Sequence, residues 1–402
     1  MRRSLALTAL VCGCAPASDG ESLGPPDDPD GPGTVVRPDL LAPTTACDLD
    51  APDPTRLLVT TTDFSTGALS VVDLATGTLE LDVAVGSTDA VPFVVGGHVV
   101  VVHRFGLDRI DTFDPSTWNV RGQVAVPTSH DAPSRNPHAV VAGPDGHLLV
   151  TSFGEAGIVE LDPLQVPARA VVGEIDLSVV ADDDGNPDAS AAVACGASMY
   201  VVTQRLDGSL SPRGEDALVA IDLHARAVVD ADPSTETVDV LPTLGTWLRQ
   251  LRRDPTDPSG QTLLGLSTGI ERIDLSAGEV TWAVPASRFV EAGAADFLQP
   301  QSFDVSDDGT QAFLAIYDAD FSQVQLYRVG LDDHAPAVPE PFAAGFDSVE
   351  HTLELVGTEL WYGSTRHDAP GLWRFDTTTD PPSSLAGPLS TGLPPYSIVT
   401  LP

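Results

Sequence analysis

The sequence predicts an all-β fold, a seven-bladed β-propeller, and three observations support this prediction. A short apolar run ending in an acidic or turn residue, followed by a tight turn, recurs seven times; the clearest copies are Leu69-Ser-Val-Val-Asp73, Ile158-Val-Glu-Leu-Asp162, Leu218-Val-Ala-Ile-Asp222 and Ile270-Glu-Arg-Ile-Asp274. The copies recur every ~50 residues, a spacing typical of four-stranded propeller blades. The last apolar segment, Tyr396–Thr400, has no partner nearby in the sequence.

The strands of the individual blades follow from apolar runs and turn signals. The first blade begins at Leu57–Thr61 and has only three strands of its own, so we expect the 396–400 segment to supply its inner strand and close the ring. Closure removes free sheet edges, which promote aggregation. The second and third blades are expected at 91–95, 99–103, 109–113, 123–126, and at 138–142, 147–151, 157–161, 170–174. The turns Gly143-Pro-Asp-Gly146 and Ser306-Asp-Asp-Gly309 are typical of hairpins.

Part of this pattern resembles a known family. One stretch resembles a unit of the YVTN-type seven-bladed propellers: it consists of Asn136-Pro-His-Ala-Val-Val-Ala142, the turn that follows, and the runs Leu148–Thr151 and Val159–Asp162. The run Leu69–Gly77 resembles the outer half of another unit. The resemblance covers approximately residues 56–402. It implies the propeller fold, but the wider group contains lactonases, amine dehydrogenase subunits and binding proteins, so it implies no single function.

The chain is strongly acidic. It carries 58 Asp and Glu residues against 20 basic residues, all of them Arg, for a formal net charge of −38. The absence of Lys excludes Schiff-base chemistry and a Walker-type phosphate loop. Binding to nucleic acid or to anionic lipid headgroups is disfavoured, because both need a positive surface. The acidity also favours solubility.

The N-terminus is expected to direct export. Residues 1–13 have the charged start (Arg2, Arg3) and a short apolar stretch of a signal peptide, too short to span a bilayer. The run Val11-Cys12-Gly13-Cys14 resembles a bacterial lipobox, which implies lipidation of Cys14, and Ala15 then implies sorting to the outer membrane. An ordinary signal peptide, cleaved after Ala15 or Ala17, is the alternative.

The next segment, residues 14–55, is rich in Pro, Asp and Gly, and we expect a disordered tether between the lipid and the propeller of residues 56–402. In an oxidising compartment Cys47 and Cys195 would remain as a pair of cysteines, which either form a disulfide or stay as two buried thiols.

Long connections indicate where a binding site lies. The links between the second and third strands of a blade, and between blades, open on one face of a propeller, and we assign to that face the segments 128–137, 175–189, 204–216, 286–300 and 332–346. Functional loops gather on one face. The candidate ligand-binding residues at the channel mouth are Arg104, His138, Arg205, His351 and Arg366. Together the arginines would attract an anionic ligand; alternatively, each pairs with a nearby Asp and each His only packs.

One loop has a pattern suited to a metal ion. In Asp182-Asp-Asp-Gly-Asn-Pro-Asp188, the residues Asp182, Asp184 and Asp188 place oxygen ligands around a glycine turn, as calcium prefers. The EF-hand pattern fails, because Val193 stands where its Glu belongs. A solvated acidic turn is the alternative, and we expect no other cofactor.

The sequence has no His-Glu-x-x-His motif and no glycine-rich phosphate loop. We therefore expect a lipid-anchored, extracytoplasmic, monomeric propeller that acts as a non-catalytic binding or interaction module. Its partner would be a ligand or an envelope protein, and it would contact the membrane only through the lipid. The alternative is a metal-dependent, lactonase-like hydrolase on the same propeller.

Overall fold

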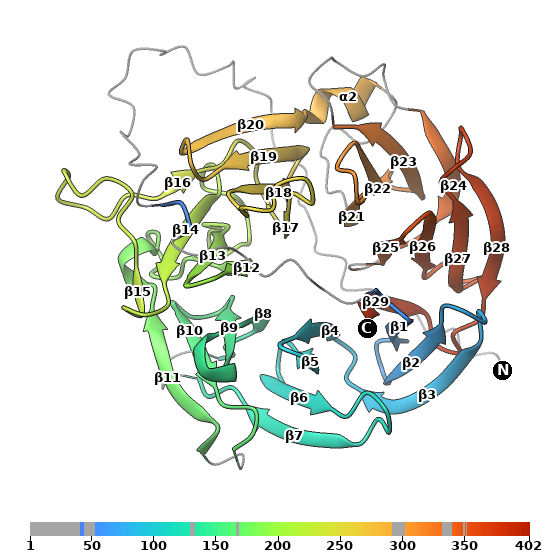
Figure 1. The fold of residues 1–402 in the computed structure, drawn as a ribbon, viewed down its shortest axis with the longest axis horizontal. Coiled ribbons are helices and arrows are strands. Elements are labelled where there is room, and N and C mark those ends of the chain that lie inside the picture. The colour runs from blue at the N-terminus through green and yellow to red at the C-terminus, as the bar shows by residue number, and fades with distance from the viewer. Residues whose placement is uncertain are drawn as a thin grey trace, which may run out of the picture. The chain divides into compact units, whose positions relative to one another are not determined.

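Seven antiparallel sheets form a ring around a common centre (Figure 1). The computed structural model describes residues 41–43, 53–128, 133–165, 169–291, 302–331, 340–348, 350 and 352–402, all within one compact unit, residues 36–402. Cys14, Cys47 and His351 lie outside the described residues. No helix in the described part of the chain is long and apolar enough to cross a membrane.

The first blade is closed by the end of the chain, as predicted. Its strands are β29 (Pro395–Leu401), β1 (Arg56–Thr62), β2 (Gly67–Asp73) and β3 (Leu79–Gly86). The last strand, β29, pairs antiparallel with β1, and Val59 lies opposite Ile398. The prediction of a seven-bladed propeller closed by the C-terminal strand is therefore confirmed (Figure 1).

The next two blades have the predicted strands. Blade 2 contains β4 (Ala90–Val95), β5 (His98–His103), β6 (Arg109–Phe113) and β7 (Val120–Ala125). Blade 3 contains β8 (Pro137–Ala142), β9 (Leu148–Ser152), β10 (Gly157–Leu161) and β11 (Val171–Asp176). The turn between β8 and β9 has Gly146 at a φ of 77°, a left-handed conformation that glycine adopts without strain.

The remaining blades follow the same order from the centre outward. Blade 4 contains β12 (Ala189–Cys195), β13 (Ser198–Thr203), β14 (Ala217–Asp222) and two short outer strands, β15 (Ala227–Val228) and β16 (Leu241–Pro242). Blade 5 contains β17 (Gln250–Arg253), β18 (Thr262–Leu266), β19 (Ile270–Asp274) and β20 (Glu279–Val284). A short helix, α2 (Ala286–Glu291), follows β20.

Blade 6 contains β21 (Ser302–Val305), β22 (Gln311–Tyr317), β23 (Val324–Gly330) and β24 (Pro341–Phe346). Blade 7 contains β25 (Leu353–Val356), β26 (Glu359–Ser364), β27 (Gly371–Asp376) and β28 (Ser383–Leu389).

The core of the propeller lies between the blades. Among the described residues, seven clusters of buried apolar side chains are found, one at each junction of neighbouring blades. Leu58 of blade 1 and Val101 of blade 2 share one such cluster, whereas the outermost strands are largely exposed. A blade therefore buries its faces only against its neighbours, which is why the repeat must close.

One expectation about the connections was wrong. The segment 332–346 does not open on the same face as the other four long segments, because it contains β24 and so joins the third strand of blade 6 to its fourth. The strand β24 includes Pro341 and Gly345, residues that are depleted in strands, so the sequence pattern did not reveal it. We call the side where the other four segments open the loop face.

Two contacts bear on the predicted tether, residues 14–55, which includes Leu41 and Cys47. Leu41 is buried with Tyr200 and Leu263 in the cluster between blades 4 and 5, and its carbonyl oxygen accepts a hydrogen bond of 2.6 Å from the Tyr200 hydroxyl. Cys195, at the end of β12, is disulfide-bonded. Its pairing with Cys47 stays a prediction, because Cys47 lies outside the described residues.

Candidate functional site

A cavity of about 770 Å³ lies at the centre of the ring. Its wall is formed by inner strands, among them β4, β8, β17 and β29, together with side chains at the loop-face ends of the second strands. Inner strands begin at the loop face and second strands end there, so residues far apart in the sequence, such as Asp89, Arg249 and Glu350, meet in this cavity.

The cavity concentrates the few basic residues of an acidic chain. Its wall contains four of the 20 arginines but only three of the 58 acidic residues. The arginines are Arg104, Arg249, Arg252 and Arg253, and the carboxylates are Asp89, Glu350 and Glu354. The charged side chains of the cavity wall therefore include more arginines than carboxylates, whereas the protein as a whole is strongly acidic.

Arg104, which follows β5, is held by three partners. Its guanidinium donates hydrogen bonds to Asp89 (2.7 Å), Glu350 (2.8 Å) and the hydroxyl of Tyr396 (2.6 Å), and that hydroxyl in turn donates to Asp89 at 2.7 Å. Burial opposes the charge of Arg104, but Glu350 and Asp89 outweigh it and hold the pKa of the guanidinium well above its usual value. Burial also raises the pKa of the Tyr396 hydroxyl. This cluster ties the closing strand to blade 2.

A second ion-pair cluster lies on β17. Arg252 is 3.1 Å from Asp304 of β21 and 3.6 Å from Glu354 of β25. Burial raises the pKa of Glu354 to about 8 and also raises the pKa of Asp304, while the Arg252 charge opposes both shifts. Arg252 is thus committed to carboxylates of blades 6 and 7.

Arg249, immediately before β17, differs from Arg104 and Arg252. No described carboxylate lies within ion-pair distance of its guanidinium, although the side chain lines the cavity. Burial lowers its pKa, and the charge of Arg104 lowers it further, while Glu350 and Asp216 oppose the shift from a greater distance. A desolvated guanidinium without a bonded partner is stabilised by any anion that enters and accepts its hydrogen bonds.

Aromatic and amide side chains complete the wall. His138, at the start of β8, stacks on Phe153 with ring centroids 4.5 Å apart and an interplanar angle of 14°. Gln250 accepts a hydrogen bond from the Phe303 backbone, so its amide nitrogen remains able to donate into the cavity. The wall therefore offers donors beside flat apolar surfaces, a combination typical of small-molecule sites.

The structure brings together only part of the predicted set. Arg104 and His138 line the central cavity, whereas Arg205 lines a second cavity of about 550 Å³ over blade 4, with Asp207 and Arg213. Arg366 lines neither cavity: it pairs with Asp368 at 2.6 Å and donates a hydrogen bond to the Gly345 carbonyl. His351 lies outside the described residues.

The acidic loop has no converging set of ligands. Asp182 and Asp184 accept hydrogen bonds from the backbone of their own loop at 3.1 and 2.9 Å. Asp188 accepts from the Leu206 backbone at 2.7 Å and from the Asn186 side chain. Burial, with the charges of Asp184 and Asp182, raises the pKa of Asp188 to about 7. No group of three His, Cys, Asp or Glu side chains in the described ranges is arranged to hold a metal ion, and the calcium site stays a prediction.

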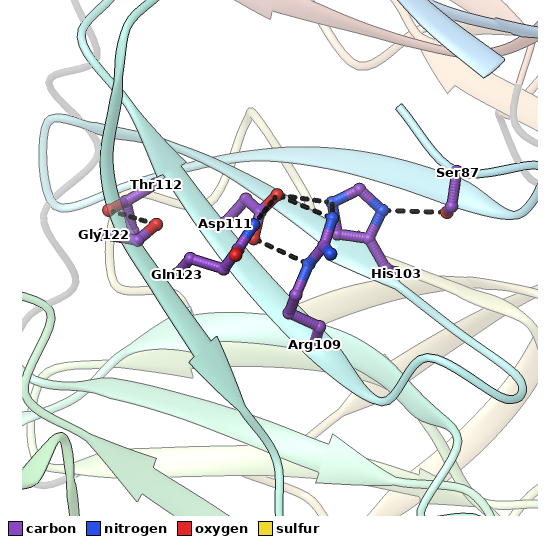
Figure 2. A network of polar contacts seen from close by, with 7 residues as sticks. All are labelled: Ser87, His103, Arg109, Asp111, Thr112, Gly122 and Gln123. Atoms are coloured by element: carbon purple, nitrogen blue, oxygen red, sulfur yellow. Dashed lines mark hydrogen bonds and ion pairs between the residues drawn. The ribbon is translucent and has the colours of Figure 1, made fainter. Parts of the chain in front are cut away.

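A buried polar network in blade 2 was not anticipated from the sequence (Figure 2). The ring of His103 contacts the Ser87 hydroxyl at 2.8 Å through Nδ1 and the Asp111 carboxylate at 3.0 Å through Nε2. Arg109 lies 2.9 Å from Asp111 and 3.3 Å from His103 Nε2. A polar His at the end of the apolar run of β5 was the available signal in the sequence.

This Ser–His–Asp arrangement lies away from both described cavities. The Asp111 carboxylate, which would orient the ring in a catalytic triad, is also bonded to Arg109, at 2.9 and 3.0 Å (Figure 2). Neither described cavity includes Ser87, and His103 is fully buried. We interpret the network as a set of hydrogen bonds that holds the connection from blade 1 to blade 2 in place.

Comparison with known proteins supports the fold. No protein-family model matches the chain, and no curated protein matches it. Among solved structures, it is similar to a periplasmic gluconolactonase of Pseudomonas aeruginosa, with a TM-score of 0.58 and 15% identity over 86% of this chain and 99% of that one. A protein from Lactobacillus plantarum gives a TM-score of 0.52 and 14% identity over 87% and 100%. At such identity the likeness extends to the propeller fold alone.

Proposed function

We propose that this propeller is a non-catalytic binding module whose central cavity captures a small organic anion. The observation that carries the proposal is Arg249, a guanidinium in the cavity wall without a bonded carboxylate among the described residues. The donors of Gln250 and the His138–Phe153 stack lie in the same wall. They fit a carboxylate or phosphate group attached to a body with an apolar face.

The chemistry of arginine favours this class of ligand. A guanidinium presents a planar fork of donors that matches the two oxygens of a carboxylate or phosphate, and such charge-assisted pairs are stronger than neutral hydrogen bonds. Arg104 and Arg252 have these oxygens supplied by the protein itself, at 2.8 Å and 3.1 Å. Arg249 is the arginine of this wall for which an added anion supplies them.

A hydrolase receives less support from the same residues. A metal-dependent lactonase needs converging ligands around an open position, and the described residues contain no group of three His, Cys, Asp or Glu side chains fit for this. The Ser87 network lies outside the cavity. We therefore place no catalytic step in the central cavity and include no calcium in the proposal.

We also propose that the protein is a monomer in the cell envelope, anchored in the outer membrane through a lipid on Cys14. The lipobox-like run at residues 11–14 and the disulfide at Cys195 support this location, because disulfides persist in oxidising compartments. Mass spectrometry of the mature N-terminus tests the anchor. An unmodified terminus beyond residue 15 would rule out lipidation.

The binding proposal is tested by isothermal titration calorimetry of the purified protein with citrate, gluconate and phosphate as probes. Arg249→Gln removes the charge, and a charged hydrogen bond contributes about 1.5–3 kcal/mol. We therefore expect a loss of at least about tenfold in affinity for each anion that binds. Arg121→Gln is the matched control, because Arg121 lies on the outer strand β7 and pairs with Asp114. Equal affinity of the wild type and Arg249→Gln for every probe would refute the proposal.

A further inference from the structure

Two fully buried carboxylates bond to the segment that precedes Arg249. Asp216, before β14, and Glu271, on β19, are both 0% exposed. Neither forms an ion pair with a described residue, unlike Asp304 with Arg252. A carboxylate buried without a cation is costly unless it accepts hydrogen bonds or takes up a proton.

Both carboxylates accept hydrogen bonds from one segment, residues 243–248, which we call the support segment. Glu271 accepts the backbone N–H groups of Leu244 and Gly245, each at 3.0 Å, and the hydroxyl of Ser267 at 2.5 Å. Asp216 accepts the backbone N–H of Leu248 at 2.5 Å through Oδ2. The support segment ends immediately before Arg249, so these two carboxylates fix where Arg249 enters the cavity.

Other contacts hold the same segment. The carbonyl oxygen of Leu248 accepts hydrogen bonds from Gln204 at 3.1 Å and Ser190 at 3.3 Å. At Gly245 an added Cβ would lie 2.3 Å from the Ser267 hydroxyl, so the segment packs too closely for a side chain there. The backbone around Arg249 is thus fixed on several sides.

The second oxygen of Asp216 is left without a partner. Oδ1 is buried and has no hydrogen-bond partner in the described part of the chain. Burial raises the pKa of Asp216 to about 8, and Glu271 raises it too, whereas the N–H groups of Leu248 and Trp247 and the Arg249 charge lower it. Burial raises the pKa of Glu271 as well, with Glu215 adding to the shift. The charged groups that act on Arg249 are Glu350, Asp216 and Arg104.

We propose that Asp216, together with Glu271, is a positioning residue for Arg249 and couples capture of the anion to uptake of a proton. The inference rests on the proposed anion site. The proton comes from solvent and binds Asp216 Oδ1, the oxygen without a partner.

The direction of the coupling follows from charge. The positive charge of Arg249 favours the ionised form of Asp216, and a bound anion offsets that charge, so the anion strengthens proton binding at Asp216. By linkage, protonation of Asp216 strengthens anion binding by the same factor. The affinity is therefore highest where Asp216 is protonated and falls as pH rises through about 8, the pKa of Asp216.

The test is calorimetric titration with citrate at about pH 6 and about pH 9, on either side of that pKa, in two buffers of different ionisation enthalpy. In the wild type we expect almost no proton uptake at about pH 6, where Asp216 is already protonated, measurable proton uptake at about pH 9, where it is mostly ionised before the anion binds, and an affinity several-fold lower at the higher pH. Asp216→Asn mimics the protonated form, so it should bind citrate with little pH dependence and no proton uptake at this site. Asp232→Asn is the matched control, since Asp232 is also buried but holds a loop through Ser234. Proton uptake that persists in Asp216→Asn would overturn the inference and leave the anion site intact.

A measurement without ligand separates the two proposals. An Asp with a raised pKa in the folded state contributes stability at low pH that is lost as pH rises toward that pKa. The denaturant midpoint of the wild type, relative to that of Asp216→Asn, should therefore fall between about pH 5 and about pH 8. A constant difference would show that Asp216 is ionised throughout and would refute the coupling. Failure of citrate, gluconate and phosphate to bind at all would refute the anion site, and the coupling with it.

Discussion

The closing strand offers the sharpest prediction about stability, through the hydroxyl of Tyr396. Tyr396 lies on β29, is 6% exposed, and its hydroxyl accepts from Arg104 at 2.6 Å and donates to Asp89 at 2.7 Å. Tyr396→Phe removes both hydrogen bonds and keeps the ring, so no cavity forms. Arg104 keeps Asp89 and Glu350 at 2.7 Å and 2.8 Å, and no charge is left without a partner.

The magnitude follows from the kind of bonds lost. Each hydrogen bond to a charged group contributes about 1.5–3 kcal/mol, and because the charges remain paired we take the lower end, about 3 kcal/mol for the two. With an unfolding entropy of about 2.1 cal/mol/K per residue and about 350 folded residues, the melting temperature should fall by about 4 °C.

A matched substitution tests the reasoning. Tyr200 is buried as well, but its hydroxyl bonds to neutral groups, the Leu41 carbonyl at 2.6 Å and Ser198. Tyr200→Phe should lose about 1 kcal/mol. Both variants are compared with the wild type by denaturant titration, in which an unchanged m-value shows that the unfolding reaction is the same. If Tyr396→Phe loses no more unfolding free energy than Tyr200→Phe, the conclusion that the Arg104 cluster stabilises the closure of the ring is refuted.

Three further outcomes are expected. In denaturant titration, His103→Ala should lower the free energy of unfolding by about 2–4 kcal/mol, because it leaves buried polar partners unsatisfied. The control His224→Ala, at an exposed position, should change that free energy by less than about 0.5 kcal/mol. Reduction of the disulfide at Cys195 should lower the unfolding free energy by about 2–4 kcal/mol, measured with and without reductant, and an unchanged midpoint would contradict a stabilising role. For the anion site, the net charge of −38 repels anions at long range, so citrate association in stopped-flow experiments should speed up as salt shortens the Debye length to about 8 Å; a slower rate would contradict this.

Much of the ring could be predicted because its signals are local. The expected strand 147–151 is β9, Leu148–Ser152, and 157–161 matches β10. Alternating apolar residues and turn signatures determine such strands within a few residues. The outer strands of blades 4 and 6 lacked those signals. The strands β15 and β16 have only two residues each, and their place depends on pairing with β14, which is not visible from their own sequence.

The candidate site was predictable only where topology alone positions a residue. Arg104 follows a second strand and His138 lies at the start of an inner strand, so both were expected at the channel mouth, and both line the central cavity. Arg249 was not expected. It stands in the run Arg249-Gln-Leu-Arg-Arg253, and nothing within that run shows that Arg252 meets Asp304 while Arg249 meets no described carboxylate. That difference depends on blades 6 and 7, far away in the sequence.

The state of Arg249 results from how the nearby carboxylates are already used. In a chain with 58 acidic residues, an arginine is expected to pair, as Arg121 does with Asp114 and Arg272 with Asp254. The two carboxylates that act on Arg249 are engaged elsewhere: Glu350 binds Arg104 at 2.8 Å, and Asp216 accepts the Leu248 N–H at 2.5 Å. Moving either one toward Arg249 would break a buried hydrogen bond and leave its donor unsatisfied. An anion from solvent breaks no such bond, so the network that holds Arg249 in place also keeps it available to a ligand.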